Sequence, residues 1–217
     1  MTRRIIVGFF QSVDGVVQAP GGPEEDPSGG FEIGGWSVGY FDELLGQQIE
    51  EAMTKPFDLV LGRRTYEIFA AHWPYDEGPI ADRLNGATKH VASRILEQTE
   101  WANSQLIRGD VATAIARLKA QDGPELQVQG STALLQTLLG AGLIDEFRFW
   151  IFPVIAGSGK RLFGDGAGPA GLRLTSSTTS PSGVLVATYE PAGDIQQGSF
   201  AFEEPTEAEI RRREAAD

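Results

Sequence analysis

The chain has 217 residues and contains no cysteine. Disulfide bonds, thiolate metal sites and cysteine nucleophiles are therefore excluded, although the compartment is only weakly constrained. The sequence also has no apolar run near the roughly 20 residues that a membrane-spanning helix needs. The apolar run over residues 5–10 is too short for a signal peptide and has no cleavage site after it. We therefore expect a cytoplasmic protein that does not enter a membrane.

Basic residues are scarce: the chain has 18 Lys and Arg against 30 Asp and Glu, which gives a net charge of −12. Nucleic acids and anionic membranes both favour basic surfaces, so we expect neither as a partner. The two histidines, His72 and His90, stand too far apart in the sequence to suggest a metal site, and we expect no metal. In such an acidic chain, anion binding has to come from a focused group of arginines.

Apolar runs alternate with stretches of helical periodicity through most of the chain. The predicted strands are residues 5–10, 57–61, 88–92, 106–107, 126–129 and 147–155, and the predicted helices are 40–53, 65–72, 111–121 and 131–139. Two further strands, 172–177 and 184–190, flank the turn residues 180–183 and form a hairpin. This order predicts an α/β fold with a mostly parallel central sheet and a C-terminal antiparallel hairpin at its edge.

Composition divides the chain into a domain over residues 1–191 and a polar, charged tail over 192–217, which has a short helix from Thr206. Residues 20–35 are rich in glycine and proline, and loops of that length are usually lids or disordered. No regular structure is predicted for residues 75–87.

Three turns that follow predicted strands have the residues that bind phosphate. They are Gly62-Arg63-Arg64-Thr65, Ser93-Arg94 and Gly130-Ser131-Thr132. Free backbone N–H groups at a helix start bind anions, and arginine adds forked, permanently charged donors. Parallel strands end at one edge of a sheet, so the three turns should lie together. Each alone is equally consistent with an ordinary strand-to-helix connection; together they predict a site for a dinucleotide.

The same turns, with Ser12-Val13-Asp14-Gly15 before them and residues 152–163 after them, follow a known order. In order and spacing the chain resembles the dihydrofolate reductase fold, and most closely the reductase domain of bacterial riboflavin biosynthesis and its stand-alone relatives. The resemblance runs from residue 5 to about residue 191. It implies a three-layer α/β sandwich for the domain 1–191.

The resemblance also implies NADPH as the cofactor. By position, Arg63, Arg64 and Thr65 would contact the pyrophosphate and the adenosine ribose phosphate, while Ser93 and Arg94 would flank the 2′-phosphate. A positive side chain in both turns favours NADPH over NADH.

The third turn would hold the pyrophosphate through its backbone N–H groups. Gly130, Ser131 and Thr132 are the residues that the resemblance implies. The related family often has two adjacent glycines here, sometimes joined by a cis peptide bond, whereas this chain has Gln129-Gly130. A cis bond after Gln129 would cost about 3–4 kcal/mol.

The implied chemistry is hydride transfer to a C=N or C=O bond of a small heterocycle of the pterin or pyrimidine kind. Asp42 stands about where dihydrofolate reductases have their catalytic carboxylate, with Trp36 upstream towards the substrate. Asp14 is a second catalytic candidate, because the riboflavin branch has a similar turn near its substrate. Alternatively, Asp42 only favours the first turn of a helix and Asp14 only a tight turn.

Other functions stay open. The chain could be the 5-amino-6-(5-phosphoribosylamino)uracil reductase of riboflavin biosynthesis, although it lacks a deaminase domain with zinc-binding Cys and His residues. A genuine dihydrofolate reductase is another alternative, which the long second element makes less favourable. The chain could also be a dinucleotide-binding module without turnover, dimeric through its edge strands.

Overall fold

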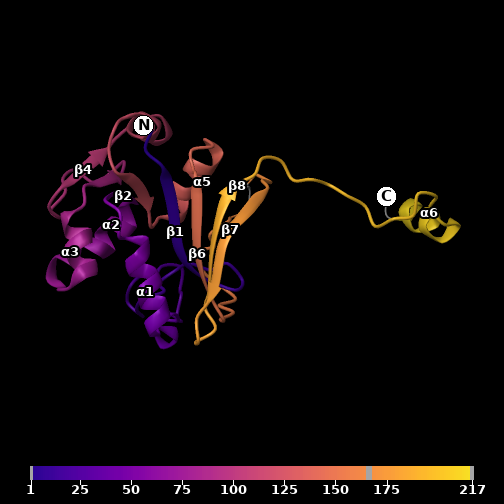
Figure 1. The fold of residues 1–217 in the computed structure, drawn as a ribbon, viewed down its shortest axis with the longest axis horizontal. Helices are drawn as coiled ribbons and strands as arrows, with labels where there is room; N and C mark the ends of the chain where they lie inside the picture. The colour runs from indigo at the N-terminus through magenta and orange to yellow at the C-terminus, as the bar shows by residue number, and fades with distance from the viewer. Residues whose placement is uncertain (1, 165–167, 216–217) are drawn as a thin grey trace.

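The computed structural model describes residues 2–164 and 168–215. Residue 1 and residues 165–167 of the predicted domain, and residues 216–217 of the predicted tail, lie outside the described residues. Figure 1 shows a central sheet with helices packed against it and a C-terminal segment that leads away from the body.

Eight strands form one sheet in the order β4-β3-β2-β5-β1-β6-β8-β7. Their bounds are β1 Ile5–Ser12, β2 Phe57–Gly62, β3 Lys89–Ala92, β4 Ser104–Ile107, β5 Glu125–Val128, β6 Glu146–Phe152, β7 Leu172–Thr179 and β8 Leu185–Pro191. Strands β1 to β6 pair in parallel, β8 runs antiparallel to β6, and β7 runs antiparallel to β8. The predicted mostly parallel sheet with an antiparallel edge hairpin is confirmed.

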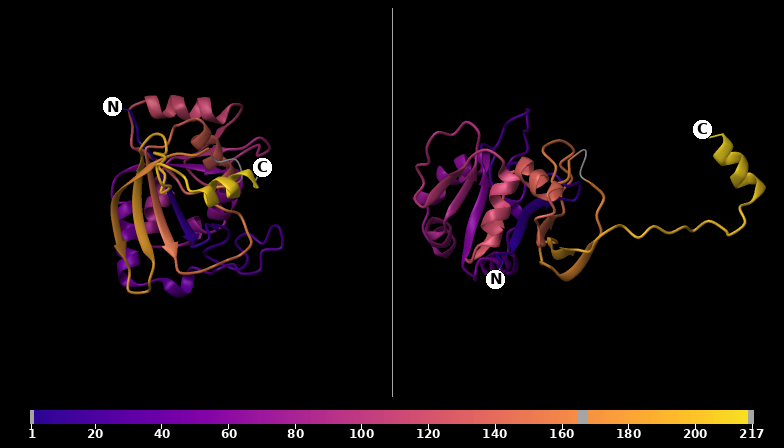
Figure 2. Two further views of the ribbon diagram at one scale, coloured as in Figure 1. Left: turned by 90° about the vertical axis from the view of Figure 1, so that its right-hand side faces the viewer. Right: turned by 90° about the horizontal axis from the view of Figure 1, so that it is seen from above.

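Helices cover both faces of the sheet and so make three layers (Figure 2). They are α1 Glu43–Ala52, α2 Arg63–Ala70, α3 Pro79–Gly86, α4 Val111–Ala120, α5 Thr132–Gly140 and, beyond the sheet, α6 Glu207–Glu214. On one face, Ile115 of α4 and Leu135 of α5 pack in one cluster with Val7 of β1. On the other face, α1 packs against β6, and α2 and α3 pack against β2 and β3.

Strand β1 explains the continuous apolar run near the amino end. Its residue Val7 is fully buried in the cluster with α4 and α5, while Phe10 packs with the cluster on the opposite face. A strand that is covered on both faces has no need for alternating polar residues. Strand β7, at the open edge, has mostly exposed side chains.

The prediction for residues 75–87 was wrong, because this stretch contains α3. Gly78 with φ 120° precedes Pro79 at the first helical position, where proline is well suited to begin a helix. Ala81 and Leu84 are buried, and Leu84 packs in one cluster with Trp101. Only two of the eight residues are buried, so the sequence pattern was too weak to indicate the helix.

Beyond Pro191 the chain runs as an extended segment to α6, away from the sheet (Figures 1 and 2). Thr206 caps α6, as the sequence indicated, by accepting a hydrogen bond from the Glu209 N–H. None of the helices in residues 2–164 and 168–215 combines the length and the apolar character needed to cross a membrane.

Candidate functional site

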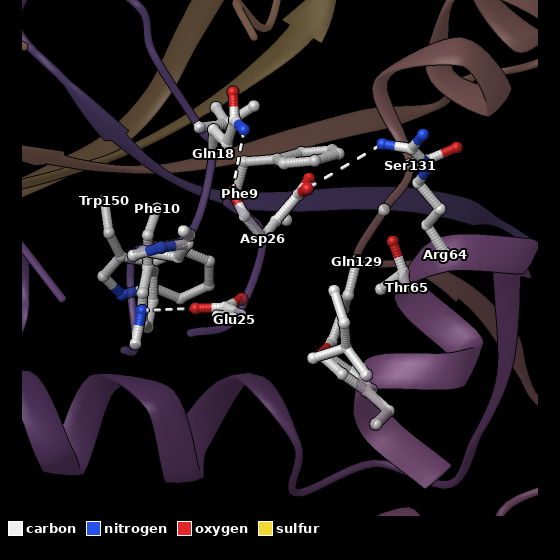
Figure 3. Close-up of a pocket in the computed structure, with 18 of the residues that line it drawn as sticks. Phe9, Phe10, Gln18, Glu25, Asp26, Arg64, Thr65, Gln129, Ser131 and Trp150 are labelled. Atoms are coloured by element: carbon white, nitrogen blue, oxygen red, sulfur yellow. Dashed lines mark hydrogen bonds and ion pairs between the residues drawn. The ribbon is translucent and has the colours of Figure 1, made fainter. Parts of the chain in front are cut away.

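A cavity of about 1050 Å³ lies between the sheet and the helices α1 and α2, under the segment 17–26. Its walls are largely apolar: Phe10 and Trp150 come from the sheet, and Ile49 and Phe69 come from the helices. Ligand sites are typically concave and apolar with a few placed polar groups. This cavity has the size and composition of such a site, and Figure 3 shows the side chains around it.

The fold brings the three phosphate-type turns to one edge of the sheet. Strands β3, β2 and β5 are neighbours, and all three run parallel. Gly62 pairs with Ala92. The second turn begins at the next residue, Ser93, so the first and second turns lie side by side. Gly62 also donates its N–H to the Gly130 carbonyl oxygen at 3.0 Å, which joins the first turn to the third. The expected adjacency of the three turns is therefore present.

The first and third turns border the cavity, and the second does not. The lining residues from these turns are Arg63, Arg64, Thr65, Gly130, Ser131 and Thr132. Ser93 is buried, and its hydroxyl oxygen accepts hydrogen bonds from the N–H groups of Ile95 and Leu96. Arg94 is exposed and forms no ion pair with any residue that the structure describes.

The backbones of the first and third turns approach each other so closely that only glycine fits. A Cβ atom on Gly62 would lie 2.3 Å from the Ser131 Oγ, and one on Gly130 would lie 2.3 Å from the Thr65 Oγ1. Gly130 also has φ 143°, and the peptide bond that follows it is cis. The cis bond thus joins Gly130 to Ser131, one residue beyond the bond after Gln129 that the sequence brought into question.

The helices that start at these two turns have no side chain capping their N–H groups. Gly62 precedes α2 and Ser131 precedes α5, and neither makes a side-chain capping bond. By contrast, Asp42 caps α1 and Asp110 caps α4. The first N–H groups of a helix have no partner within it and need an acceptor from outside. Here two uncapped helix starts border one cavity, which is a suitable arrangement for an anionic ligand.

Both arginines of the first turn belong to α2 itself, whereas the sequence placed them before the helix. Arg63 Nη1 lies 2.8 Å from both carboxylate oxygens of Glu67, one turn further along. Arg64 donates to the Ser28 Oγ at 2.9 Å and lies 3.8 Å from Asp26. These contacts are exposed, and exposed ion pairs are weak, so a phosphate could replace them at small cost.

Asp42 caps α1 and does not line the cavity. One carboxylate oxygen accepts from the Leu45 N–H and the other from the Ser182 N–H, both at 2.9 Å. The Leu45 N–H, with Ser182 and Ser180, lowers the pKa of Asp42 to about 2. The carboxylate therefore joins the start of α1 to the β7–β8 turn. This arrangement agrees with the helix-start alternative, while the catalytic role stays a prediction.

Asp14 joins two turns at the edge of the sheet. Its carboxylate accepts from the Ser12 Oγ at 2.6 Å and from the N–H groups of Ala156 and Gly157 at 2.9 Å, and it pairs with Arg161. The Ser12 hydroxyl, with these N–H groups, holds the pKa of Asp14 well below its usual range. Asp14 is not among the residues that line the cavity, and its catalytic role also stays a prediction.

The loop over residues 20–35 is held to the body by several hydrogen bonds. The indole Nε1 of Trp36 donates to the Gln18 carbonyl oxygen at 2.8 Å, and the Ser37 hydroxyl donates to the Pro20 carbonyl oxygen at 2.8 Å. Lys160 forms an ion pair with Asp26. Trp36 packs against Phe152 and does not line the cavity, so the substrate contact expected for it stays a prediction.

The sequence did not indicate several polar residues that line the cavity. They are Gln18, Glu25, Asp26, Gln127, Gln129, Arg148 and Lys160. Gln127 and Gln129 are two residues apart around the end of β5, and residues at that spacing in a strand point to the same face. Two glutamines on one face of a buried strand were therefore a signal in the sequence. Glu25 and Asp26 gave no such signal, because their loop has no regular period.

A sequence profile of the RibD C-terminal domain matches residues 3–186. The chain belongs to this family. Among curated proteins, the uncharacterized protein YyaP of Bacillus subtilis (strain 168) is 28% identical over 198 residues, which are 86% of this chain and 94% of YyaP.

Two solved structures share the fold of this RibD C-terminal domain protein. A pyrimidine reductase-like protein from Corynebacterium diphtheriae has a TM-score of 0.60 and 14% identity over 88% of this chain and 93% of its own. Dihydrofolate reductase from Enterococcus faecalis, solved with NADP(H), has a TM-score of 0.54 and 15% identity over 88% of this chain and 99% of its own. The expected family and the dihydrofolate reductase-like fold are both confirmed.

Proposed function

We propose that this protein is an NADPH-dependent reductase that transfers a hydride to a C=N or C=O bond of a small heterocycle of the pterin or pyrimidine kind. One observation carries the proposal: two uncapped helix starts, α2 and α5, border a single cavity of about 1050 Å³. The family and the fold support a reductase-type function.

The residues present fit a dinucleotide phosphate. No side chain caps the starts of α2 and α5, so their first backbone N–H groups are available to a pyrophosphate. Arg63 and Arg64 add positive charge to the cavity lining, to which Ser131 and Thr132 add hydroxyl groups. When bound, NADPH would supply the hydride, and the protein's task would be to orient the ligands and to exclude water.

The preference for the phosphorylated cofactor rests on Arg94. This side chain is exposed beside the first turn and has no ion pair within the described residues, so no internal carboxylate competes with a ligand phosphate. Charge-assisted hydrogen bonds from arginine to phosphate are strong and are frequently bidentate. The assignment places Arg94 at the 2′-phosphate, and Arg63 and Arg64 at the phosphates nearer the cavity.

Titration calorimetry with NADPH and NADH tests the proposal. We expect R94A to weaken NADPH binding by about tenfold or more, as loss of a charge-assisted hydrogen bond implies, and to leave NADH binding nearly unchanged. R63A/R64A should weaken the binding of both NADPH and NADH. The control is R173A, because Arg173 is an exposed arginine on β7 that pairs with Glu190, away from the cavity.

Two outcomes would contradict the proposal. Absence of NADPH binding to the wild-type protein up to millimolar concentration would exclude the reductase function. Equal losses of NADPH and NADH affinity in R94A would exclude the 2′-phosphate assignment alone. NADPH oxidation with dihydrofolate, 5-amino-6-(5-phosphoribosylamino)uracil and small carbonyl compounds then separates the substrate classes, and binding without any oxidation would favour a non-catalytic module.

A further inference from the structure

Reduction of a C=N or C=O bond requires a proton as well as a hydride. We infer that Glu25, on the loop that covers the cavity, is the catalytic residue that donates this proton to the substrate. The inference rests on the proposed reductase function and adds to it a named proton donor, which neither the family nor the sequence pattern indicated.

Glu25 is half-buried in a mostly apolar part of the cavity. It lines the cavity together with Phe10 and Trp150, and in Figure 3 it lies on their side of the view, away from Arg64, Thr65 and Ser131. Its Oε2 accepts from the Gly21 N–H at 2.6 Å. Within the described part of the chain it forms no ion pair, so no cation stabilises its ionised form.

The next residue along the chain, Asp26, has the opposite environment. Burial opposes its ionisation, but hydrogen bonds from Lys160 and Ser28 outweigh burial and lower the pKa of Asp26. For Glu25, burial is the largest influence and raises the pKa; hydrogen bonds from the N–H groups of Gly21 and Gly22 lower it by less, and the charge of Asp26 raises it slightly further. When the environments of two carboxyl groups shift their pKa values in opposite directions, one group typically acts as the acid and the other stays ionised.

Other titratable groups around the cavity are less suited to donate a proton. The charged or titratable lining residues besides Glu25 are Asp26, Arg63, Arg64, His72, Arg148 and Lys160. Arginine does not titrate in proteins, and Lys160 is held in its ion pair with Asp26. The His72 side chain is 65% exposed and lies 3.6 Å from Asp76, so it faces solvent. Among these lining residues, Glu25 is a half-buried carboxyl group whose pKa burial raises.

Trp150, which lines the same part of the cavity, has an indole N–H without an acceptor in the part of the chain that the structure describes. Trp150 is 7% exposed, and its indole Nε1 is buried without a hydrogen-bond partner among the described residues. Buried polar groups in native proteins nearly always have partners, so this indole N–H is an exception in a residue that lines the cavity.

The proton step balances within the proposed reaction. As the substrate carbon gains the hydride, the electron pair of the double bond moves to the nitrogen or oxygen. That atom takes the proton of Glu25, so an N–H or O–H bond forms, the carboxyl O–H bond breaks, and a carboxylate remains. Water at the cavity mouth then returns a proton to Glu25.

The first test measures the carboxyl group itself and needs no substrate. In protein labelled with ¹³C at the glutamate side-chain carboxyl carbon, one resonance is assigned to Glu25 by its absence from E25Q. We expect this resonance to titrate above the ordinary glutamate pKa of 4.5. A Glu25 resonance that titrates at or below that value would overturn the proposal.

The second test follows NADPH oxidation in single turnovers, with dihydrofolate and 5-amino-6-(5-phosphoribosylamino)uracil as probes. E25Q keeps an acceptor for the Gly21 N–H but has no acidic proton, so we expect the rate to fall by about 10²-fold or more while NADPH affinity is unchanged. The wild-type rate should decline as pH rises through the pKa of Glu25, and the residual E25Q rate should not. E25D should regain part of the rate and the pH dependence.

The matched control is E24Q, which removes the same charge from the exposed neighbouring residue and should leave the rate unchanged. An E25Q rate equal to wild type, with NADPH bound normally, would overturn the role of Glu25 and leave the proposed function intact. Failure of the wild-type protein to bind NADPH would instead overturn the proposed function, and the role of Glu25 with it.

Discussion

Replacing Gly130 by alanine should destabilise the protein at the point where the first and third turns meet. An alanine Cβ would lie 2.3 Å from the Oγ1, 2.9 Å from the Cγ2 and 3.1 Å from the Cβ of Thr65. Contacts under 3.0 Å force a shift, and overpacking of this kind typically costs about 1–3 kcal/mol. The residue also has φ 143°, and holding a side chain in such a conformation costs roughly 1–3 kcal/mol more.

The two contributions add up to a loss of about 2–6 kcal/mol in the free energy of unfolding. For a domain of this size that corresponds to a melting temperature lower by roughly 5–20 °C, measured by circular dichroism or calorimetry. The control is G140A at the end of α5, where a Cβ meets nothing within 4 Å and φ is not positive. There alanine should leave the melting temperature unchanged or raise it slightly.

A double-mutant cycle separates the steric contribution from the backbone contribution. T65A removes the Oγ1 and Cγ2 atoms that the new methyl group would meet, so G130A/T65A should be more stable than the sum of the single losses predicts. We expect a coupling of about 1–2 kcal/mol. A G130A protein that melts within about 1 °C of wild type, or a cycle without coupling, would refute the close approach of the two turns.

Two further variants test the contacts around the site and the tail. D42A should melt below wild type at neutral pH because it loses the α1 cap. The fold lowers the pKa of Asp42 from 3.8 to about 2, so the stability that this carboxylate contributes is present above pH 3.8 and is lost as the pH falls towards 2. The melting temperatures of D42A and wild type should therefore converge near pH 2. Equal melting temperatures at neutral pH would show that Asp42 does not hold α1. Deleting residues 197–217 should leave both the melting temperature and NADPH binding unchanged, since this segment lies beyond β8 and leads away from the sheet; a marked loss of either would show that the tail belongs to the domain.

Local sequence patterns were sufficient for most of the sheet. Residues 5–10 and 57–61 are continuous apolar runs because both faces of β1 and β2 are covered, and a turn of Ser, Pro and Gly between two alternating strands indicated the β7–β8 hairpin. Helix α3 was missed for the same physical reason: only Ala81 and Leu84 are buried, so its pattern carries little apolar signal. Local periodicity reports burial, and it is weak where burial is small.

The sequence also determined which residues could bind phosphate, since each turn has its glycine, hydroxyl or arginine in place. It could not establish that the first and third turns border one cavity and that the second lies beside them, because this depends on the strand order β3-β2-β5. Strand order is set by contacts between residues far apart in the chain, to which no local pattern refers.

For the carboxylates, too, the sequence gives the residue type and the tertiary structure gives the environment. Asp14, Asp42 and Glu25 are alike in sequence, and only tertiary packing gives each its environment. All three accept backbone N–H groups, which lower the pKa of Asp14 and Asp42, whereas burial outweighs them at Glu25 and raises its pKa. The sequence by itself determined the α/β architecture and the residues of the phosphate turns, because these follow from local periodicity and chemistry. The tertiary structure alone decided which carboxyl groups line the cavity and which of them has a raised pKa, since burial and charge depend on distant neighbours.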